Sequence, residues 1–142
     1  MLETHIYIEI DSRTQRESDK NYGYILECLG KTSTKEGFGT ARATYNKANL
    51  IAITEAIKRF KEPCEIHIHT RDEYVLNMIE RCLNAWAENG FQNAKGKPVA
   101  NQKEWMELWE QSQNHLLLTE PGEHSYSSWL QTQFKERTQN AK

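Results

Sequence analysis

Cys64-Glu65-Ile66-His67-Ile68-His69-Thr70-Arg71-Asp72-Glu73-Tyr74-Val75 is the stretch that decides the fold. Apolar and polar side chains alternate over its first half, which predicts a buried strand over 64–70. From residue 72 the apolar spacing lengthens, and it predicts an amphipathic helix that runs to about residue 86. The functional residues of α/β proteins usually lie where a strand ends and a helix begins. The residue at that junction, Arg71, is therefore the first candidate for function.

Bulk composition narrows the class of protein. The 142 residues suit one domain, and 18 Lys plus Arg against 20 Asp plus Glu give a net charge of −2, so no overall electrostatic attraction to nucleic acid is expected. Three widely spaced cysteines in apolar segments are typical of reduced core thiols. Because the N-terminus is acidic we expect no signal peptide, and no apolar run approaches the ~20 residues of a membrane span. We expect a cytoplasmic protein with no membrane association.

The order of patterns along the chain predicts a five-stranded mixed sheet with helices on both faces. Three strands form an antiparallel meander, and two later strands run parallel. Asn46 is the expected N-cap of the first helix, and Asn101 to Glu104 has the spacing of a capping box. One domain, 1–142, accounts for the whole chain, with about 136–142 as a frayed tail. The expected strands are 5–11, 21–31, 36–44, 64–70 and 115–119, and the expected helices are 46–60, 72–86, one beginning at 101 and one over about 125–134, with 12–20 and 87–100 as loops.

Two groups of motifs resemble the ribonuclease H family, in its bacterial form, over nearly the whole chain. The first is the segment 64–75 quoted above, which matches without a gap. The second comprises Trp86, Gly90-Phe91, Lys97-Pro98-Val99-Ala100-Asn101 and Trp105, in the family's spacing. The resemblance implies the ribonuclease H-like fold.

The resemblance also implies where catalysis would occur. The family cuts the RNA strand of RNA–DNA hybrids with two Mg²⁺ ions, about 4 Å apart, held by four carboxylates. Those four positions fall on Asp11, Asn49, Arg71 and, within a residue or two, Ser128. One carboxylate remains and a permanent cation has been added, a change of about four charge units. We therefore expect that two-metal catalysis has been lost and that no cofactor is bound.

Two hypotheses concern the polar face of the fourth strand. Because the first and fourth strands are neighbours in the family's sheet, we expect Asp11 and Arg71 to form an ion pair where the metals would lie; the alternative is that both are solvated. His67 and His69 share the face of Arg71, and His-x-His on a strand is a metal-ligand spacing that Glu9 or Asp11 could complete. The alternative is that they are ordinary, satisfied core histidines.

The segment from Trp86 to Asn101 matches the family's basic handle, which grips the DNA backbone of the hybrid. Phosphate contacts need basic side chains, and only Lys95 and Lys97 remain here. We expect Trp86, Phe91 and these two lysines to support weak binding of a nucleic-acid duplex or hybrid. The family's mobile-loop histidine, thought to assist product release, compares with His124, which we expect to be a surface residue.

Two classes of function follow. The first is a catalytically silent ribonuclease H-like domain that binds nucleic acid or a protein partner. The second is an active RNA–DNA hybrid ribonuclease with a rearranged site, dependent on Mg²⁺ or Mn²⁺.

Overall fold

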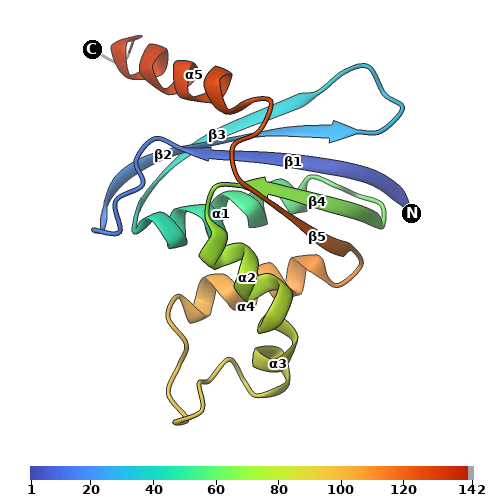
Figure 1. Ribbon diagram of the computed structural model, residues 1–142, viewed down its shortest axis with the longest axis vertical. Helices are drawn as coiled ribbons and strands as arrows, with labels where there is room; N and C mark the ends of the chain where they lie inside the picture. The colour runs from blue at the N-terminus through green and yellow to red at the C-terminus, as the bar shows by residue number, and fades with distance from the viewer. Residues whose placement is uncertain (141–142) are drawn as a thin grey trace.

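Five strands and five helices make up the described part of the chain. The computed structural model describes residues 1–140, with side chains through residue 138 (Figure 1). In chain order the elements are β1 (Leu2–Ile10), β2 (Ser18–Cys28), β3 (Lys35–Ala43), α1 (Tyr45–Lys58), β4 (Cys64–Thr70), α2 (Glu73–Arg81), α3 (Leu83–Glu88), α4 (Gln102–Ser112), β5 (Leu116–Pro121) and α5 (Ser127–Asn140).

The strands form one mixed sheet in the order β3-β2-β1-β4-β5. The pairs β1–β2 and β2–β3 are antiparallel, whereas β1–β4 and β4–β5 are parallel. The predicted meander plus two parallel strands is therefore confirmed. The parallel register pairs His5 with His67 and Tyr7 with His69, so the polar side chains of β1 and β4 lie side by side on one face.

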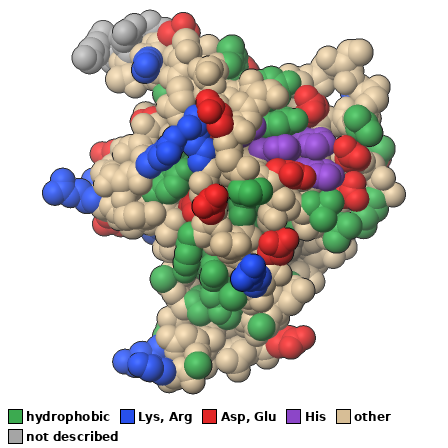
Figure 2. Space-filling model, in the orientation of Figure 1, with side chains coloured by type: hydrophobic (Ala, Val, Ile, Leu, Met, Phe, Trp, Pro, Cys, Tyr) green, Lys and Arg blue, Asp and Glu red, His purple; other side chains and the backbone are tan. Residues whose placement is uncertain are grey.

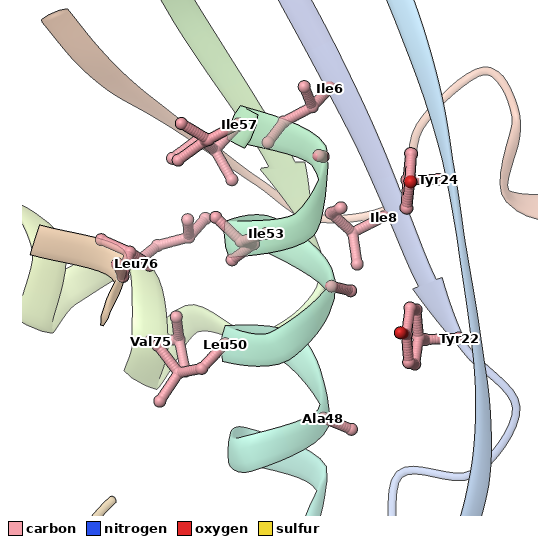
Figure 3. Packing of buried hydrophobic residues seen from close by; sticks show 14 of the residues in the cluster. Ile6, Ile8, Tyr22, Tyr24, Ala48, Leu50, Ile53, Ile57, Val75 and Leu76 are labelled. Atoms are coloured by element: carbon pink, nitrogen blue, oxygen red, sulfur yellow. The ribbon is translucent and has the colours of Figure 1, made fainter. Parts of the chain in front are cut away.

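The main hydrophobic core lies on the other face of the sheet, under α1 (Figure 3). Ile6 and Ile8 of β1 and Ile53 of α1 are fully buried there. Each such side chain stabilises the fold by roughly 1.5–3 kcal/mol relative to an exposed one. Helix α4 packs behind α1 and contributes Trp105 and Leu108 to this core.

Helix α5 covers only part of the polar face. Its Leu130 and Phe134 form a small second core with Tyr7 and Ile25 of the sheet. These two strand residues belong to β1 and β2, so the β4–β5 side of this face lies beyond α5. The prediction of helices on both faces is confirmed, and the uneven cover decides where polar groups are accessible.

Several element boundaries differ from the predictions. Thr44, not Asn46, caps α1, because its hydroxyl accepts a hydrogen bond from the Lys47 amide at 3.2 Å. The predicted helix over 72–86 is two helices, because Cys82 has φ −120° and leaves the helical region. Asn101 precedes α4 in the left-handed region (φ 59°) and makes no side-chain cap, so the capping box is absent there. Helix α5 extends to Asn140, through most of the predicted frayed tail, and residues 141–142 lie outside the described residues.

Strand β2 begins earlier than predicted, and it carries an unforeseen buried lysine. Lys20, expected in a loop, is only 1% exposed. Its ammonium group donates hydrogen bonds to the Arg16 and Ala43 carbonyls and to the Ser18 hydroxyl, at 2.7–2.9 Å. These acceptors satisfy the charged group inside the fold and anchor the β1–β2 loop to the end of β3.

None of the helices in residues 1–140 has the length and apolar character needed to cross a lipid bilayer.

Candidate functional site

Arg71 lies directly after β4, and its side chain joins two carboxylates. Its Nε donates to Glu9 Oε2 at 3.1 Å, and its Nη2 lies 3.6 Å from Glu123 Oε1. The Glu9 side chain is 2% exposed and that of Arg71 is 23% exposed. Continuing the register from Tyr7 and His69 places Glu9 opposite Arg71. A partly buried ion pair therefore occupies the end of the β1–β4 ladder.

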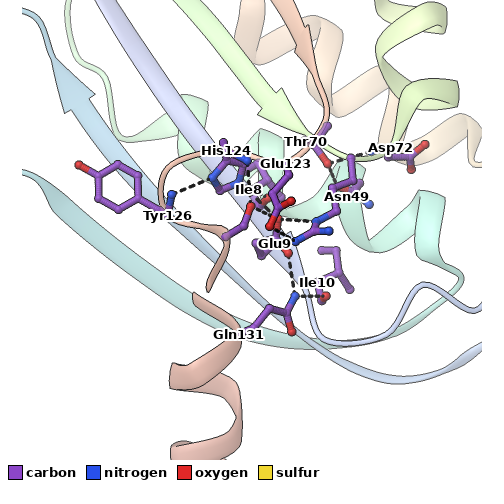
Figure 4. A network of polar contacts seen from close by, with 12 residues as sticks. Ile8, Glu9, Ile10, Asn49, Thr70, Asp72, Glu123, His124, Tyr126 and Gln131 are labelled. Carbon is purple, nitrogen blue, oxygen red and sulfur yellow. Dashed lines mark hydrogen bonds and ion pairs between the residues drawn. The ribbon is translucent and has the colours of Figure 1, made fainter. Parts of the chain in front are cut away.

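Glu9 is the centre of this network (Figure 4). Besides Arg71, its Oε2 accepts a hydrogen bond from the Ser127 hydroxyl at 2.8 Å, and its Oε1 accepts one from Gln131 Nε2 at 2.7 Å. Gln131 also donates to the Ile10 carbonyl at 2.9 Å. Both carboxylate oxygens thus already have protein donors, and the contacts fasten α5 to β1.

Asp11 does not pair with Arg71, so the expected Asp11–Arg71 ion pair is wrong. Asp11 lies beyond the end of β1 and is exposed. Its carboxylate accepts hydrogen bonds from the Asn21 amide at 3.0 Å and from Asn21 Nδ2 at 2.8 Å, across the β1–β2 loop. Glu9, two residues earlier on the same face, is in register with Arg71 and takes its place.

The two remaining predicted positions hold neutral side chains. Asn49 is fully buried, accepts a hydrogen bond from the Thr70 hydroxyl at 2.7 Å and donates to the Tyr45 carbonyl at 3.1 Å. Ser128 is exposed, and it is the preceding residue, Ser127, that contacts Glu9. Asn49 therefore supports the end of β4, whereas Ser128 is exposed beside the serine that bonds to Glu9.

Asp72 caps α2 beside this network. Its carboxylate accepts a hydrogen bond from the Val75 amide at 3.1 Å, and the Asn46 amide, turned with its nitrogen toward Asp72, donates to Oδ2 at 2.8 Å. The residue is 4% exposed. Burial raises the pKa of Asp72, although the backbone hydrogen bonds of α2 oppose this.

The side chain of His124 is buried, which corrects the prediction of a surface histidine. The side chain is 3% exposed. Its Nε2 donates to the Ile8 carbonyl at 2.8 Å, and its Nδ1 accepts from the Tyr126 amide at 3.2 Å, so the neutral ring satisfies both contacts. Burial lowers the pKa of His124, despite the Ile8 carbonyl and the Glu9 carboxylate that favour its charged form. His124 therefore holds the loop before α5 against β1.

His67 and His69 lie further along the same face, and the structure adds His5 to them. The rings of His5 and His67 stack with centroids 4.4 Å apart, and His5 Nδ1 lies 2.8 Å from His69 Nε2. Burial, followed by the neighbouring His5 and His124, lowers the pKa of His69 to about 4. Burial would also lower the pKa of His67, but hydrogen bonds to Glu120 and Glu65 outweigh it and raise that pKa. Neither Glu9 nor Asp11, the expected additional ligands, is part of this group.

The handle, residues 86–101, projects from the domain between α3 and α4 (Figure 1). Its aromatic side chains pack against the core, with Phe91 buried and Trp86 partly buried. Phe91 is 6% exposed and belongs to the main core, and Trp86 packs edge-on against Trp105 at 5.2 Å. A buried ring cannot stack on a base, so the expectation for Phe91 is corrected. Lys95 and Lys97 are exposed at the tip, in a turn whose amides donate to Asn93 Oδ1.

Glu9 was not predicted from the sequence as the partner of Arg71, and Ser127, Gln131 and His5 were not predicted as site residues. For Glu9, the sequence offers one signal: it shares the alternation of Asp11 but lies inside the strand, whereas Asp11 lies just beyond its end. No comparable local signal points to Ser127 or Gln131, because they reach Glu9 only through the docking of α5.

Comparison with known proteins settles the family. The family model described as RNase H matches residues 4–119. The chain belongs to the ribonuclease H family. Ribonuclease H of Mesorhizobium japonicum is 36% identical over 94 residues, which is 66% of this chain and 52% of the relative. Ribonuclease H of Campylobacter curvus is likewise 36% identical over 94 residues, covering 62% of the relative. The chain thus spans between about half and two thirds of the length of these curated ribonucleases H.

Solved structures of the ribonuclease H family have the same fold. LC9-RNase H1, described as a type 1 RNase H with the type 2 active-site motif, has a TM-score of 0.68 at 16% identity, over 97% of this chain and 70% of that one. The PFV RNase H domain has a TM-score of 0.64 at 18% identity, over 93% of this chain and 90% of that one. At these identities the likeness concerns the fold.

Proposed function

We propose that this ribonuclease H-like domain has lost two-metal catalysis and acts as a nucleic-acid-binding module. The observation that carries the proposal is the hydrogen bonding of the Glu9 carboxylate, which is in register with Arg71. Both of its oxygens accept hydrogen bonds from protein donors, and one of those donors is the Arg71 guanidinium. A carboxylate that holds a metal ion needs its lone pairs free for that ion.

The residues around Arg71 do not fit a pair of Mg²⁺ ions. Two dications about 4 Å apart require several anionic oxygens to hold them together. Here Glu9 is enclosed, Glu123 contacts the guanidinium, and Asn49 and Ser127 are neutral. A Mg²⁺ ion about 4 Å from the guanidinium would also be repelled by about 8 kcal/mol at an effective dielectric constant of ~20. These features support the loss of catalysis.

The proposed binding surface is the handle. Its two exposed lysines lie at the tip of a projection whose base is fixed to the core by Phe91 and Trp86. The two basic side chains favour contact with a phosphate backbone, and such contact is sensitive to salt. The net charge of −2 adds no attraction, so we expect the binding to be weak. We propose an RNA–DNA hybrid or another duplex as the ligand, on the basis of family membership and these lysines.

A cleavage assay tests the loss of catalysis. An end-labelled RNA–DNA hybrid is incubated with the wild type in Mg²⁺ and, separately, in Mn²⁺. We expect no cleavage above the rate without protein. Arg71→Asp, checked for folding by circular dichroism, should also remain inactive because Asn49 and Ser127 are still neutral. Robust turnover by the wild type with either ion would overturn the proposal and establish the active ribonuclease instead.

A gel-shift series tests the binding. The hybrid, duplex DNA and single strands are compared at two salt concentrations. The double variant Lys95→Ala/Lys97→Ala should bind the hybrid more weakly and reduce the slope of log K against log salt by about 2. Lys31→Ala/Lys35→Ala, which removes the same charge near the β2–β3 turn, is the matched control and should bind as the wild type does. Failure of the wild type to shift any of these ligands at low salt would refute nucleic-acid binding and favour a protein partner.

A further inference from the structure

A group of histidines and carboxylates lies on the part of the sheet face that α5 leaves uncovered. Figure 2 shows histidine side chains side by side on this surface, with acidic side chains next to them. Glu3 and His5 come from β1, and Glu65 and His67 come from β4. The parallel register pairs Glu3 with Glu65 and His5 with His67, so the four side chains occupy two rungs of the same ladder.

The potential ligand atoms converge. One ligand atom each of Glu3, His5 and His67 lie within 4.8 Å of one another, and this is the one such group of three found in the described residues. His5 Nε2 is 3.0 Å from Glu3 Oε2. His67 Nε2 is 3.3 Å from Glu65 Oε2, which places a fourth potential ligand atom next to the group. The two histidine side chains are 16–19% exposed, so an ion can enter from solvent.

The charge of this group favours a cation. Three carboxylates surround the histidines, those of Glu3, Glu65 and Glu120. Within residues 1–140, the ion-pair partners found for these carboxylates are histidines, which are charged only when protonated. Three carboxylates this close together repel one another, and a bound dication would offset most of this repulsion.

His69 contacts the group through His5, one of the potential ligands. Its Nε2 lies 2.8 Å from His5 Nδ1. When His5 Nδ1–H donates to His69, the lone pair of His5 Nε2 points toward Glu3. Histidines that bind metals commonly give their other ring nitrogen to such a partner, which sets the tautomer and the ring orientation. His69 is therefore a positioning residue rather than a ligand.

We propose that Glu3, His5 and His67, with Glu65 as fourth ligand, form a site for a transition-metal dication of the Zn²⁺ type that joins β1 to β4. Two imidazoles and two carboxylates suit Zn²⁺, whereas Mg²⁺ prefers oxygen ligands alone. In a tetrahedral site with metal–ligand distances of about 2.1 Å, the ligand atoms lie about 3.4 Å from one another. Side-chain rotations that move the ligand atoms by roughly 1 Å bring them to this spacing. The stacked rings of His5 and His67 tilt apart as the ion enters. The site is separate from Arg71 and from the proposed loss of catalysis.

Direct titration tests the proposal. The full chain, with any affinity tag removed, is titrated with ZnCl₂ by calorimetry, and Co²⁺ is used as a spectroscopic probe of coordination geometry. We expect one Zn²⁺ per chain, a tetrahedral Co²⁺ spectrum that Zn²⁺ displaces, and a melting temperature that rises with Zn²⁺ but not with Mg²⁺. His69→Ala should weaken Zn²⁺ binding by about 10–100-fold. His5→Ala and His67→Ala should each lose at least as much.

The matched control is His115→Asn. His115 immediately precedes β5, and its Nδ1 accepts a hydrogen bond from the Cys64 amide, an acceptor that asparagine can replace. This variant should bind Zn²⁺ as the wild type does. The proposal is overturned if the wild type binds no Zn²⁺, or if His5→Ala and His67→Ala keep wild-type affinity. A loss of affinity in His115→Asn equal to that in His5→Ala would also overturn it.

Discussion

Substitution of Arg71 by methionine tests the network at the end of β4. Methionine keeps most of the length and apolar stem of the side chain but removes its charge and its Nε donor. Glu9, 2% exposed, would then lose the cation 3.1 Å away while remaining enclosed by α5. The variant therefore isolates the contribution of the guanidinium to the stability of the fold.

The expected magnitude follows from burial. Removing one member of a fully buried ion pair costs roughly 3–5 kcal/mol. Arg71 is 23% exposed, and Ser127 and Gln131 continue to donate to Glu9, so the loss should be smaller. We expect Arg71→Met to lower the free energy of unfolding by about 2–3 kcal/mol. At about 3 °C per kcal/mol for a domain of this size, the melting temperature falls by about 6–9 °C.

Urea unfolding followed by circular dichroism measures this loss, with an unchanged m-value as the sign that only stability has changed. Glu9→Gln and the double variant Glu9→Gln/Arg71→Met complete a double-mutant cycle, which should give a coupling energy of about 1.5 kcal/mol or more. Arg81→Met, at an exposed arginine of α2, is the control and should change stability by less than about 0.5 kcal/mol. A loss below about 0.5 kcal/mol in Arg71→Met, or strict additivity in the cycle, would refute the reasoning.

Three further perturbations test other parts of the fold. Because burial raises the pKa of Asp72, its ionised form costs stability, and the cost grows as the pH rises above the ordinary value of 3.8. Asp72→Asn, which keeps the cap acceptor, should therefore gain stability relative to the wild type between pH 4 and pH 7 in urea titrations. Gly37→Ala should lose about 1–3 kcal/mol in thermal melts, since its Cβ would collide with the Tyr24 phenol. Lys20→Met should lose about 1–3 kcal/mol in urea unfolding, because buried carbonyls lose their donor.

Local periodicity determined most of the fold. The alternation of Ile6, Ile8 and Ile10, and of Ile66 and Ile68, predicts strands with one buried face, and the structure buries all five side chains. The meander, the parallel strands and the position of Arg71 directly after β4 also follow from the sequence, because they depend on neighbours a few residues apart or on family motifs. The exact residue at which a helix starts is harder to predict from the sequence, as Thr44 shows, because several polar residues near a helix start can act as its N-cap.

Tertiary structure decided the contents of the site. Asp11 and Glu9 both lie on the polar face of the first strand, and only the register of β1 against β4, about 60 residues away, selects Glu9 as the partner of Arg71. The same register brings His5 against His67, and the docking of α5 buries His124 and delivers Ser127 to Glu9. The sequence by itself thus determined most of the strands and helices and the face on which the polar residues of the strands lie, because those follow from local spacing. Which polar residues touch depends on strand register and helix docking, and only the folded chain sets these.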